Sequence, residues 1–147
     1  VILAVDVNHA ALEKARELGA TNIVDASKGS DEDIRKELLK LTDDRGADLT
    51  IDAAGFASTS ENDVWCTRRG GRMVQVGLPI GGKRTPQIPM GFVAGREIEI
   101  VGSHGFAASD MPDILNLVST GKLDPKKLVE KEVTLEEGAR AIEDMDH

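Results

Sequence analysis

Hydrophobic and polar positions along the chain follow two periods, one typical of strands and one typical of helices. Val1–Asp6 is an apolar run that ends in a carboxylate, which predicts a strand buried on both faces. Further strands are predicted at Asn22–Asp25, Asp48–Ala53, Arg72–Gly77 and Glu97–Gly102. Segments with helical spacing separate most of these runs, so strands and helices are expected to alternate.

The first two helices have clear start and stop signals. Asn8 can cap a helix that Gly19 closes, because asparagine side chains accept hydrogen bonds from the first turn and glycine adopts the left-handed conformation at helix ends. Ser30 or Asp31 begins the second helix. Both helices are expected to pack an apolar stripe against the sheet.

A third helix is predicted from the segment Ser58–Glu61, which has the spacing of a capping box. This helix is expected to run to about Arg68, where Arg68 and Arg69 suit its negative end. Gly70 and Gly71 then stop it.

The last third of the chain is less regular. Leu78–Pro89 is rich in proline and glycine and predicts a loop. A helix is expected from residue 109 or 110 to Gly121, with Ile114, Leu115 and Val118 facing inward. An extended piece at Lys127–Thr134 and a capping box that starts at Thr134 and opens a final helix complete the prediction.

Strands that alternate with helices predict an α/β fold with a parallel sheet covered on both faces. Such sheets bind ligands at the carboxyl ends of their strands. Four places therefore become candidates: Asp6, Ala53–Gly55, Val76–Leu78 and Gly102–Gly105.

Composition narrows the class of protein. The chain has 147 residues, of which 40% are hydrophobic and 30% charged, as in an ordinary globular domain. Its net charge of −8 and its 3% of aromatic residues disfavour nucleic-acid partners, which need basic surfaces and stacking platforms. No apolar stretch approaches the roughly 20 residues of a membrane span. The single cysteine, Cys66, fits a reducing, cytoplasmic setting and excludes an intrachain disulfide.

The candidate residues have more than one reading. An acid in the position of Asp6 accepts hydrogen bonds from an adenosine ribose in dinucleotide folds, but methyltransferases place an acid there too, and an aspartate can simply start a turn. The small residues of Asp52–Gly55 and the segment Val76–Pro79 admit a flat ring or form tight turns. His104 is a candidate proton shuttle or an exposed loop residue. Cys66 is most simply a core residue, because no histidine or carboxylate is spaced with it as a metal site requires.

The ordered set of segments resembles the coenzyme domain of the medium-chain, zinc-dependent alcohol dehydrogenase family. The segments are VILAVDVN, LEKARELGATNIVDAS, GADLTIDAAG, GGRMVQVGLP, IEIVGSHG and LVSTGKLDP, and together they cover nearly the whole chain. The resemblance implies a Rossmann-like, doubly wound, mostly parallel sheet. It also implies hydride transfer between an alcohol or aldehyde and NAD, with a zinc ion that polarises the substrate oxygen.

The resemblance implies roles for the adenosine half of NAD. Asp6 would bind the ribose and favour NAD over NADP, in keeping with the lack of a basic residue directly after it. Val7 and Ala54 would flank the adenine, with Gly55 close by.

The nicotinamide half is assigned in the same way. The backbone of Val76, Ser103 and Gly105 would hold the carboxamide. The remaining implied lining residues are Gly77, Leu78 and His104. The resemblance implies no catalytic residue and no metal ligand in this chain.

Several features of the family are missing. Its zinc ligands lie in a separate catalytic domain, and its glycine-rich turn precedes the acid of Asp6 by about 20 residues. We therefore expect residues 1–147 to be a single, N-terminally truncated dinucleotide-binding domain, with about 127–147 heading toward an absent catalytic domain. This domain would lack its first, central strand and would be inactive alone. We expect strand 1–6 either to pair with strand 48–53 or to leave a gap that another chain fills. The family further implies a homodimer through the strand at 97–101.

Two other functions stay open. A methyltransferase core with an adenosyl cofactor would also use Asp6, although the end of the fourth strand lacks the Asn/Asp-Pro-Pro-aromatic signal of many amino-methylating enzymes. A non-catalytic α/β interaction module would need neither the acid nor the glycine-lined loop Gly102–Gly105.

Overall fold

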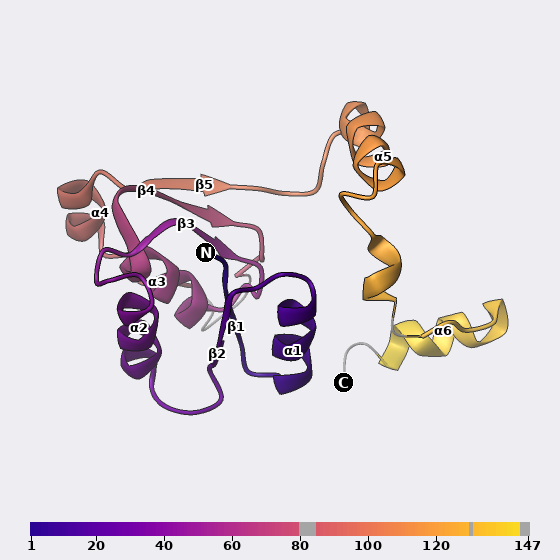
Figure 1. The fold of residues 1–147 in the computed structure, drawn as a ribbon, viewed down its shortest axis with the longest axis horizontal. Helices are drawn as coiled ribbons and strands as arrows, with labels where there is room; N and C mark the ends of the chain where they lie inside the picture. The colour runs from indigo at the N-terminus through magenta and orange to yellow at the C-terminus, as the bar shows by residue number, and fades with distance from the viewer. Residues whose placement is uncertain (80–84, 130, 145–147) are drawn as a thin grey trace. The chain divides into compact units, whose positions relative to one another are not determined.

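The computed structural model describes residues 1–79, 85–129 and 131–144. The chain divides into two compact units, residues 1–104 and residues 105–147. The first unit holds all the strands of the described residues, and the second holds short helices (Figure 1).

The first unit opens with a two-stranded parallel sheet. β1 (Leu3–Asp6) pairs with β2 (Asn22–Asp25), and α1 (His9–Glu17) packs on both strands. The Asn8 side chain accepts the N–H groups of the first turn of α1, at 2.9 Å for the nearer one, which confirms the predicted cap. The prediction that Val1–Asp6 is buried on both faces was wrong. Its residues are exposed or half-buried, because a single helix covers only one face of a strand and α1 is the one described helix with extensive packing on β1.

A second sheet has the order β3-β4-β5, with all strands parallel. Its strands are β3 (Ala47–Asp52), β4 (Thr67–Gln75) and β5 (Glu99–Gly102). Within the described residues, β1 and β3 are not paired, so the sheet is interrupted between them. The expected pairing of the first strand with strand 48–53 therefore does not form.

Helices cover one face of the β3-β4-β5 sheet. α3 (Ala57–Cys66) packs on β3 and β4, α2 (Asp31–Lys40) packs on α3, and α4 (Met90–Arg96) packs on β4. The core between them comprises Val64, Met73, Val93 and Ile98.

Among the described residues of the first unit, side chains on the opposite face of this sheet are exposed, contrary to the expectation that both faces are covered. Residues alternate along β3, so that Thr50 and Asp52 point toward α3. Leu49 and Ile51 lie on the other face, where Ile51 is 57% exposed.

The boundary between α3 and β4 differs from the prediction. β4 begins at Thr67, so Arg68 and Arg69 belong to a strand and Gly70 and Gly71 do not end a helix. The Thr67 hydroxyl lies 2.8 Å from the Thr50 hydroxyl, and this buried contact fixes the start of β4 against β3.

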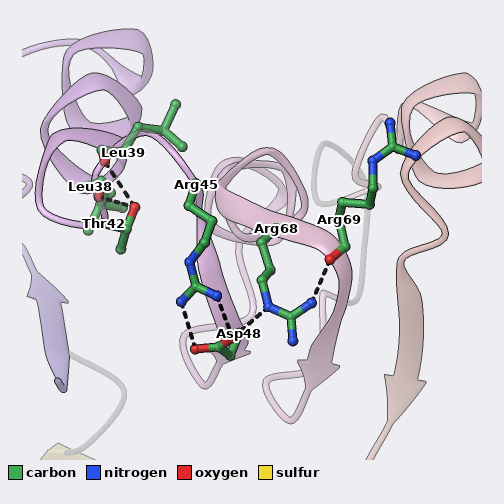
Figure 2. Close-up of polar contacts among 7 residues, drawn as sticks. All are labelled: Leu38, Leu39, Thr42, Arg45, Asp48, Arg68 and Arg69. Carbon is green, nitrogen blue, oxygen red and sulfur yellow. Dashed lines mark hydrogen bonds and ion pairs between the residues drawn. The ribbon is translucent and has the colours of Figure 1, made fainter.

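Ionic contacts also hold the start of β4. The Asp48 carboxylate binds the guanidinium groups of Arg45 and Arg68, and Arg68 also donates to the carbonyl of Arg69 (Figure 2). These hydrogen bonds, with Arg45 first, lower the pKa of Asp48 to about 2. Arg68 therefore stabilises the amino end of the sheet and not the end of a helix.

The start of α3 also differs from the prediction. α3 begins at Ala57, and Ser58 lies inside its first turn. The hydroxyl oxygen of Thr59, in the first turn of α3, accepts the N–H of Phe56 just before the helix at 3.2 Å.

The sequence prediction also missed α4. Its sequence, MGFVAGR, contains two glycines, which weaken the helix signal. Packing stabilises it: Val93 is buried, and the Phe92 ring lies 4.4 Å from the Trp65 ring, centroid to centroid. The predicted loop over Leu78–Pro89 agrees at residues 78, 79 and 85–89, while residues 80–84 lie outside the described residues.

The second unit contains α5 (Met111–Ser119) and α6 (Leu135–Glu143), with 3₁₀ turns at Ala108–Asp110 and Pro125–Leu128. The Thr134 capping box is present. The expectation that Ile114, Leu115 and Val118 face inward was wrong for Leu115 and Val118, which are 58% and 36% exposed, because this small unit has no buried core among its described residues. The expected extended piece at Lys127–Thr134 starts with a 3₁₀ turn instead, and residue 130 lies outside the described residues.

Candidate functional site

Asp6 ends β1 and directs the chain into α1. One oxygen of its carboxylate, Oδ1, accepts the N–H of Asn8 at 2.8 Å, and Asn8 in turn caps α1. The Asp6 side chain and the following Val7 are exposed, Val7 by 67%. Asp6 therefore starts the turn, as the simpler reading holds, and it also presents a carboxylate to solvent.

The ends of β3 and β4 lie against each other. Val76 and Gly77 donate their N–H groups to the carbonyl of Asp52 at 2.9 and 2.8 Å. A Cβ atom at Gly77 would lie 2.3 Å from the nitrogen of Gly55, and Gly55 has a φ of +72°, which favours glycine. Glycine is thus required at both positions for this close approach.

Side chains beside this contact stay accessible. Ala54, Val76 and Leu78 are exposed around the two glycines. A small, partly apolar surface therefore forms at the carboxyl ends of β3 and β4, where parallel sheets bind ligands.

The end of β5 joins the same edge. The N–H of Ser103 donates to the carbonyl of Gln75 at 2.9 Å. His104 is exposed and is the last residue of the first unit. Gly105 is the first residue of the second unit and has a φ of +61°.

The structure thus sorts the predicted residues into groups. Asp6 and Val7 end the β1–β2 sheet. Ala54, Gly55, Val76, Gly77, Leu78, Ser103 and His104 lie at or just after the ends of the β3-β4-β5 strands. No hydrogen bond links the two groups in the parts of the chain that the structure describes. Gly105 belongs to the other unit and is not placed with either group.

Sequence reasoning missed the role of the Asp52 side chain. Asp52 was grouped with the small residues that follow it, yet it is 2% exposed and accepts hydrogen bonds from both α3 and β4. Burial by itself raises the pKa of Asp52, but hydrogen bonds, led by the one from Gln75, bring the pKa below its ordinary value. The sequence signal that was available is an aspartate at the end of a predicted strand, followed in the next helix by a threonine and a serine, Thr59 and Ser60.

Metal ligands are not clustered in this part of the protein. Across residues 1–79, 85–129 and 131–144, no three histidine, cysteine, aspartate or glutamate side chains could hold one metal ion. Cys66 is buried, as expected of a core residue. Burial, and then the nearby charge of Asp63, raise the pKa of its thiol to about 12, which disfavours the thiolate that metals bind.

Comparison with known proteins decides the family. The family model described as zinc-binding dehydrogenase matches residues 1–120. The chain belongs to the zinc-binding dehydrogenase family. This result confirms the resemblance seen in the sequence.

Individual relatives of this chain agree with the family assignment. Sorbitol dehydrogenase 1 of Saccharomyces cerevisiae is 32% identical over 145 residues, which are 97% of this chain and 40% of that protein. The solved alcohol dehydrogenase of Aeropyrum pernix matches with a TM-score of 0.80 and 28% identity, over 98% of this chain and 39% of that one. A solved NAD-dependent alcohol dehydrogenase matches with a TM-score of 0.70 and 32% identity, over 82% of this chain and 34% of that one.

These matches confirm the predicted Rossmann-like α/β fold with parallel strands. The chain spans about 40% of the length of the curated relatives that it matches. The described helices include none that is long and apolar enough to cross a bilayer.

Proposed function

We propose that this chain is the NAD-binding part of a zinc-dependent dehydrogenase that transfers a hydride reversibly between a small alcohol and NAD. The substrate class would be an alcohol or polyol and the matching aldehyde or ketone. The similarity to sorbitol dehydrogenase 1 supports a polyol as the substrate.

The observation that carries the proposal is Asp6. It ends a parallel strand, is exposed, and uses Oδ1 for the N–H of Asn8, so Oδ2 is left as an acceptor for a ligand. Ribose hydroxyl groups donate well to such a carboxylate. The residues that follow, Val7 and Asn8, carry no positive charge for a 2′-phosphate, which favours NAD over NADP.

The other proposed contacts continue along the strand ends. Val7 and Ala54 would flank the adenine next to Gly55, which has no side chain to obstruct a flat ring. The backbone of Val76 and Ser103 would hold the nicotinamide carboxamide, with Gly77, Leu78 and His104 next to them. The N–H groups of Val76 and Ser103 are already donated within the sheet, so we assign the contact to their carbonyl oxygens.

Zinc does not fit the residues described here, because they form no three-ligand cluster. When bound elsewhere in such an enzyme, zinc supplies Lewis-acid polarisation of the substrate oxygen. This chain's proposed part is to bind and orient NAD.

Nucleotide titration tests the proposal. The part of Saccharomyces cerevisiae sorbitol dehydrogenase 1 that precedes its matched region is joined to Val1, and NADH and NADPH binding are followed by nicotinamide fluorescence. We expect NADH to bind more tightly than NADPH. Asp6→Asn should weaken NADH binding roughly 10- to 100-fold, because a hydrogen bond to a charged group contributes about 1.5–3 kcal/mol.

Asp48→Asn is the matched control. It removes the same charge from an exposed aspartate at the amino end of the β3-β4-β5 sheet, and it should leave the NADH affinity within about twofold. Equal binding of NADH and NADPH would contradict the assignment of Asp6. Binding of S-adenosylmethionine instead of either nucleotide would favour a methyltransferase.

We further propose a homodimer through the strand at 97–101 and a cytoplasmic location. β5 is an edge strand whose four residues are all exposed, and an unpaired apolar edge favours pairing with a second copy. The buried, single cysteine suits a reducing compartment. Light scattering should give the mass of two chains, and a monomer mass would contradict the dimer.

A further inference from the structure

Asp52 occupies an unusual place for a carboxylate. It is the last residue of β3, and its side chain points to the covered face of the sheet, where it is 2% exposed. Most buried charges in proteins are paired with an opposite charge. Among the described residues Asp52 has no cationic partner and relies on hydrogen bonds alone.

Each carboxylate oxygen of Asp52 has its own donors. Oδ1 accepts the N–H groups of Ala54 at 2.9 Å and Gly55 at 3.1 Å, and the Thr59 hydroxyl lies 3.0 Å from it. Oδ2 accepts the Ser60 hydroxyl at 2.8 Å and the side-chain amide of Gln75. The donors come from the loop after β3, from α3 and from β4, so one carboxylate fastens all three.

Gln75 extends this network to the next strand ends. Its side-chain nitrogen lies 2.8 Å from the carbonyl oxygen of Gly77, so one amide group bridges Asp52 and Gly77. The backbone carbonyl of Gln75 accepts the N–H of Ser103 after β5. The ends of β3, β4 and β5 are therefore connected through Asp52 and Gln75.

The network fixes the conformation of the residues at the carboxyl ends of β3 and β4, which we call the cofactor edge. The N–H groups of Ala54 and Gly55 are turned inward to Asp52, which leaves Ala54 exposed beside the Gly55–Gly77 contact. Both backbone polar groups of Gly77 are hydrogen-bonded: its N–H donates to the Asp52 carbonyl, and its carbonyl accepts from the Gln75 side-chain amide. A rigid surface of this kind favours ligand binding because less conformational entropy is lost on binding.

We propose that Asp52 is a positioning residue for the cofactor edge. It holds Ala54, Gly55, Val76 and Gly77 in the arrangement that receives the NAD rings, without touching NAD itself. This inference rests on the proposed function, since the edge it positions is the edge assigned to NAD.

The first test is amide hydrogen exchange in the 147-residue chain, measured by NMR. The decisive amides are those of Val76 and Gly77, because both donate to the Asp52 backbone carbonyl, which a side-chain substitution leaves in place. Asp52→Asn should lower their protection about tenfold relative to the Met73 amide in the middle of β4. Asp52→Asn keeps Oδ1 as an acceptor and so preserves folding better than Asp52→Ala.

Thr50→Val is the matched control. Thr50 lies on the same strand and the same covered face, and its buried hydroxyl contacts Thr67 at the amino end of β4, not the carboxyl ends of the strands. The control should lower thermal stability but leave the protection of Val76 and Gly77 unchanged relative to Met73. Unchanged relative protection in Asp52→Asn would overturn the proposal.

The second test is NADH affinity, which a merely structural role would not change selectively. It is measured in the fusion protein in which the preceding part of sorbitol dehydrogenase 1 is joined to Val1. Asp52→Asn should raise the Kd for NADH about tenfold, and Thr50→Val less than about twofold. Equal weakening by both variants at a matched loss of stability would overturn the positioning role. A wild-type fusion protein that binds no NADH would instead count against the proposed function, and the exchange result alone would then decide whether Asp52 positions the edge.

Discussion

Asp63 is a buried acid that should make stability depend on pH. It lies on α3, and its Oδ2 atom is buried with no hydrogen-bond partner among the described residues. Its backbone carbonyl, by contrast, accepts the Thr67 hydroxyl at 2.7 Å. Burial, followed by repulsion from Asp52, raises the pKa of Asp63 from 3.8 to about 7.

The sign and size of the effect follow from this pKa. Between pH 4 and 7 the unfolded chain has lost the Asp63 proton while the folded chain keeps it, so raising the pH favours unfolding. Each pH unit costs about 1.4 kcal/mol, and the shift of the pKa from 3.8 to about 7 gives a total near 4 kcal/mol, as an upper bound. Above pH 7 the loss should level off.

Asp63→Asn removes this ionisation while keeping the shape of the side chain. At pH 8 the variant should have a free energy of unfolding about 1–4 kcal/mol higher than the wild type, because a buried amide without a partner offsets part of the gain. At pH 4 the two proteins should be equally stable within about 1 kcal/mol.

Urea unfolding followed by Trp65 fluorescence is the assay, since Trp65 lies on the same helix and is the chain's one tryptophan. Glu37→Gln, an exposed acid on α2, is the control for the loss of one negative charge and should leave the pH profile unchanged. A difference between wild type and Asp63→Asn that is the same at pH 4 and pH 8 would refute the reasoning.

Two further predictions concern packing. Gly77→Ala should destabilise the chain by roughly 2–4 kcal/mol, because its Cβ atom would lie 2.3 Å from the Gly55 nitrogen. Gly95→Ala is the control and should be neutral or stabilising, because nothing lies within 4 Å of the added Cβ atom. Thermal unfolding compares the two variants, and equal melting temperatures would contradict the close contact. Cys66 should resist thiol reagents in the folded chain because it is buried and its pKa is about 12, and it should react only as urea unfolds the protein; rapid labelling without denaturant would contradict its burial.

The sequence predicted those elements whose local signals agree with their packing. β2 was predicted at its observed bounds, and α1 has the Asn8 cap that was expected. In both cases the caps and apolar spacing act within a few residues, so no distant contact is needed to find them.

The elements that were missed depend on contacts between distant residues. α4 forms although it contains two glycines, because Val93 and Phe92 pack against the core. β4 starts early because the Thr67 hydroxyl meets Thr50, a residue 17 positions away. Neither contact leaves a periodic pattern in the sequence.

The candidate site also contains some residues that could be predicted from the sequence and others that could not. The strand-end positions of Asp6, Gly55 and Gly77 could be predicted, because small residues and acids after apolar runs are visible in the sequence. The role of Asp52 could not, since its donors include Gln75, which is brought near only by the parallel pairing of β3 and β4.

The central claim, that this chain presents an NAD-binding edge, is tested most directly by chemical-shift mapping. NADH is added to the isotopically labelled fusion protein in which the preceding part of sorbitol dehydrogenase 1 is joined to Val1, and the backbone amide shifts are followed by NMR. The account predicts shifts confined to the amides around Asp6, Gly55, Val76 and Ser103, with smaller changes for NADPH at Asp6. A folded fusion protein with no shifts at millimolar NADH, or with shifts only at the amino end of the sheet around Asp48, would contradict it.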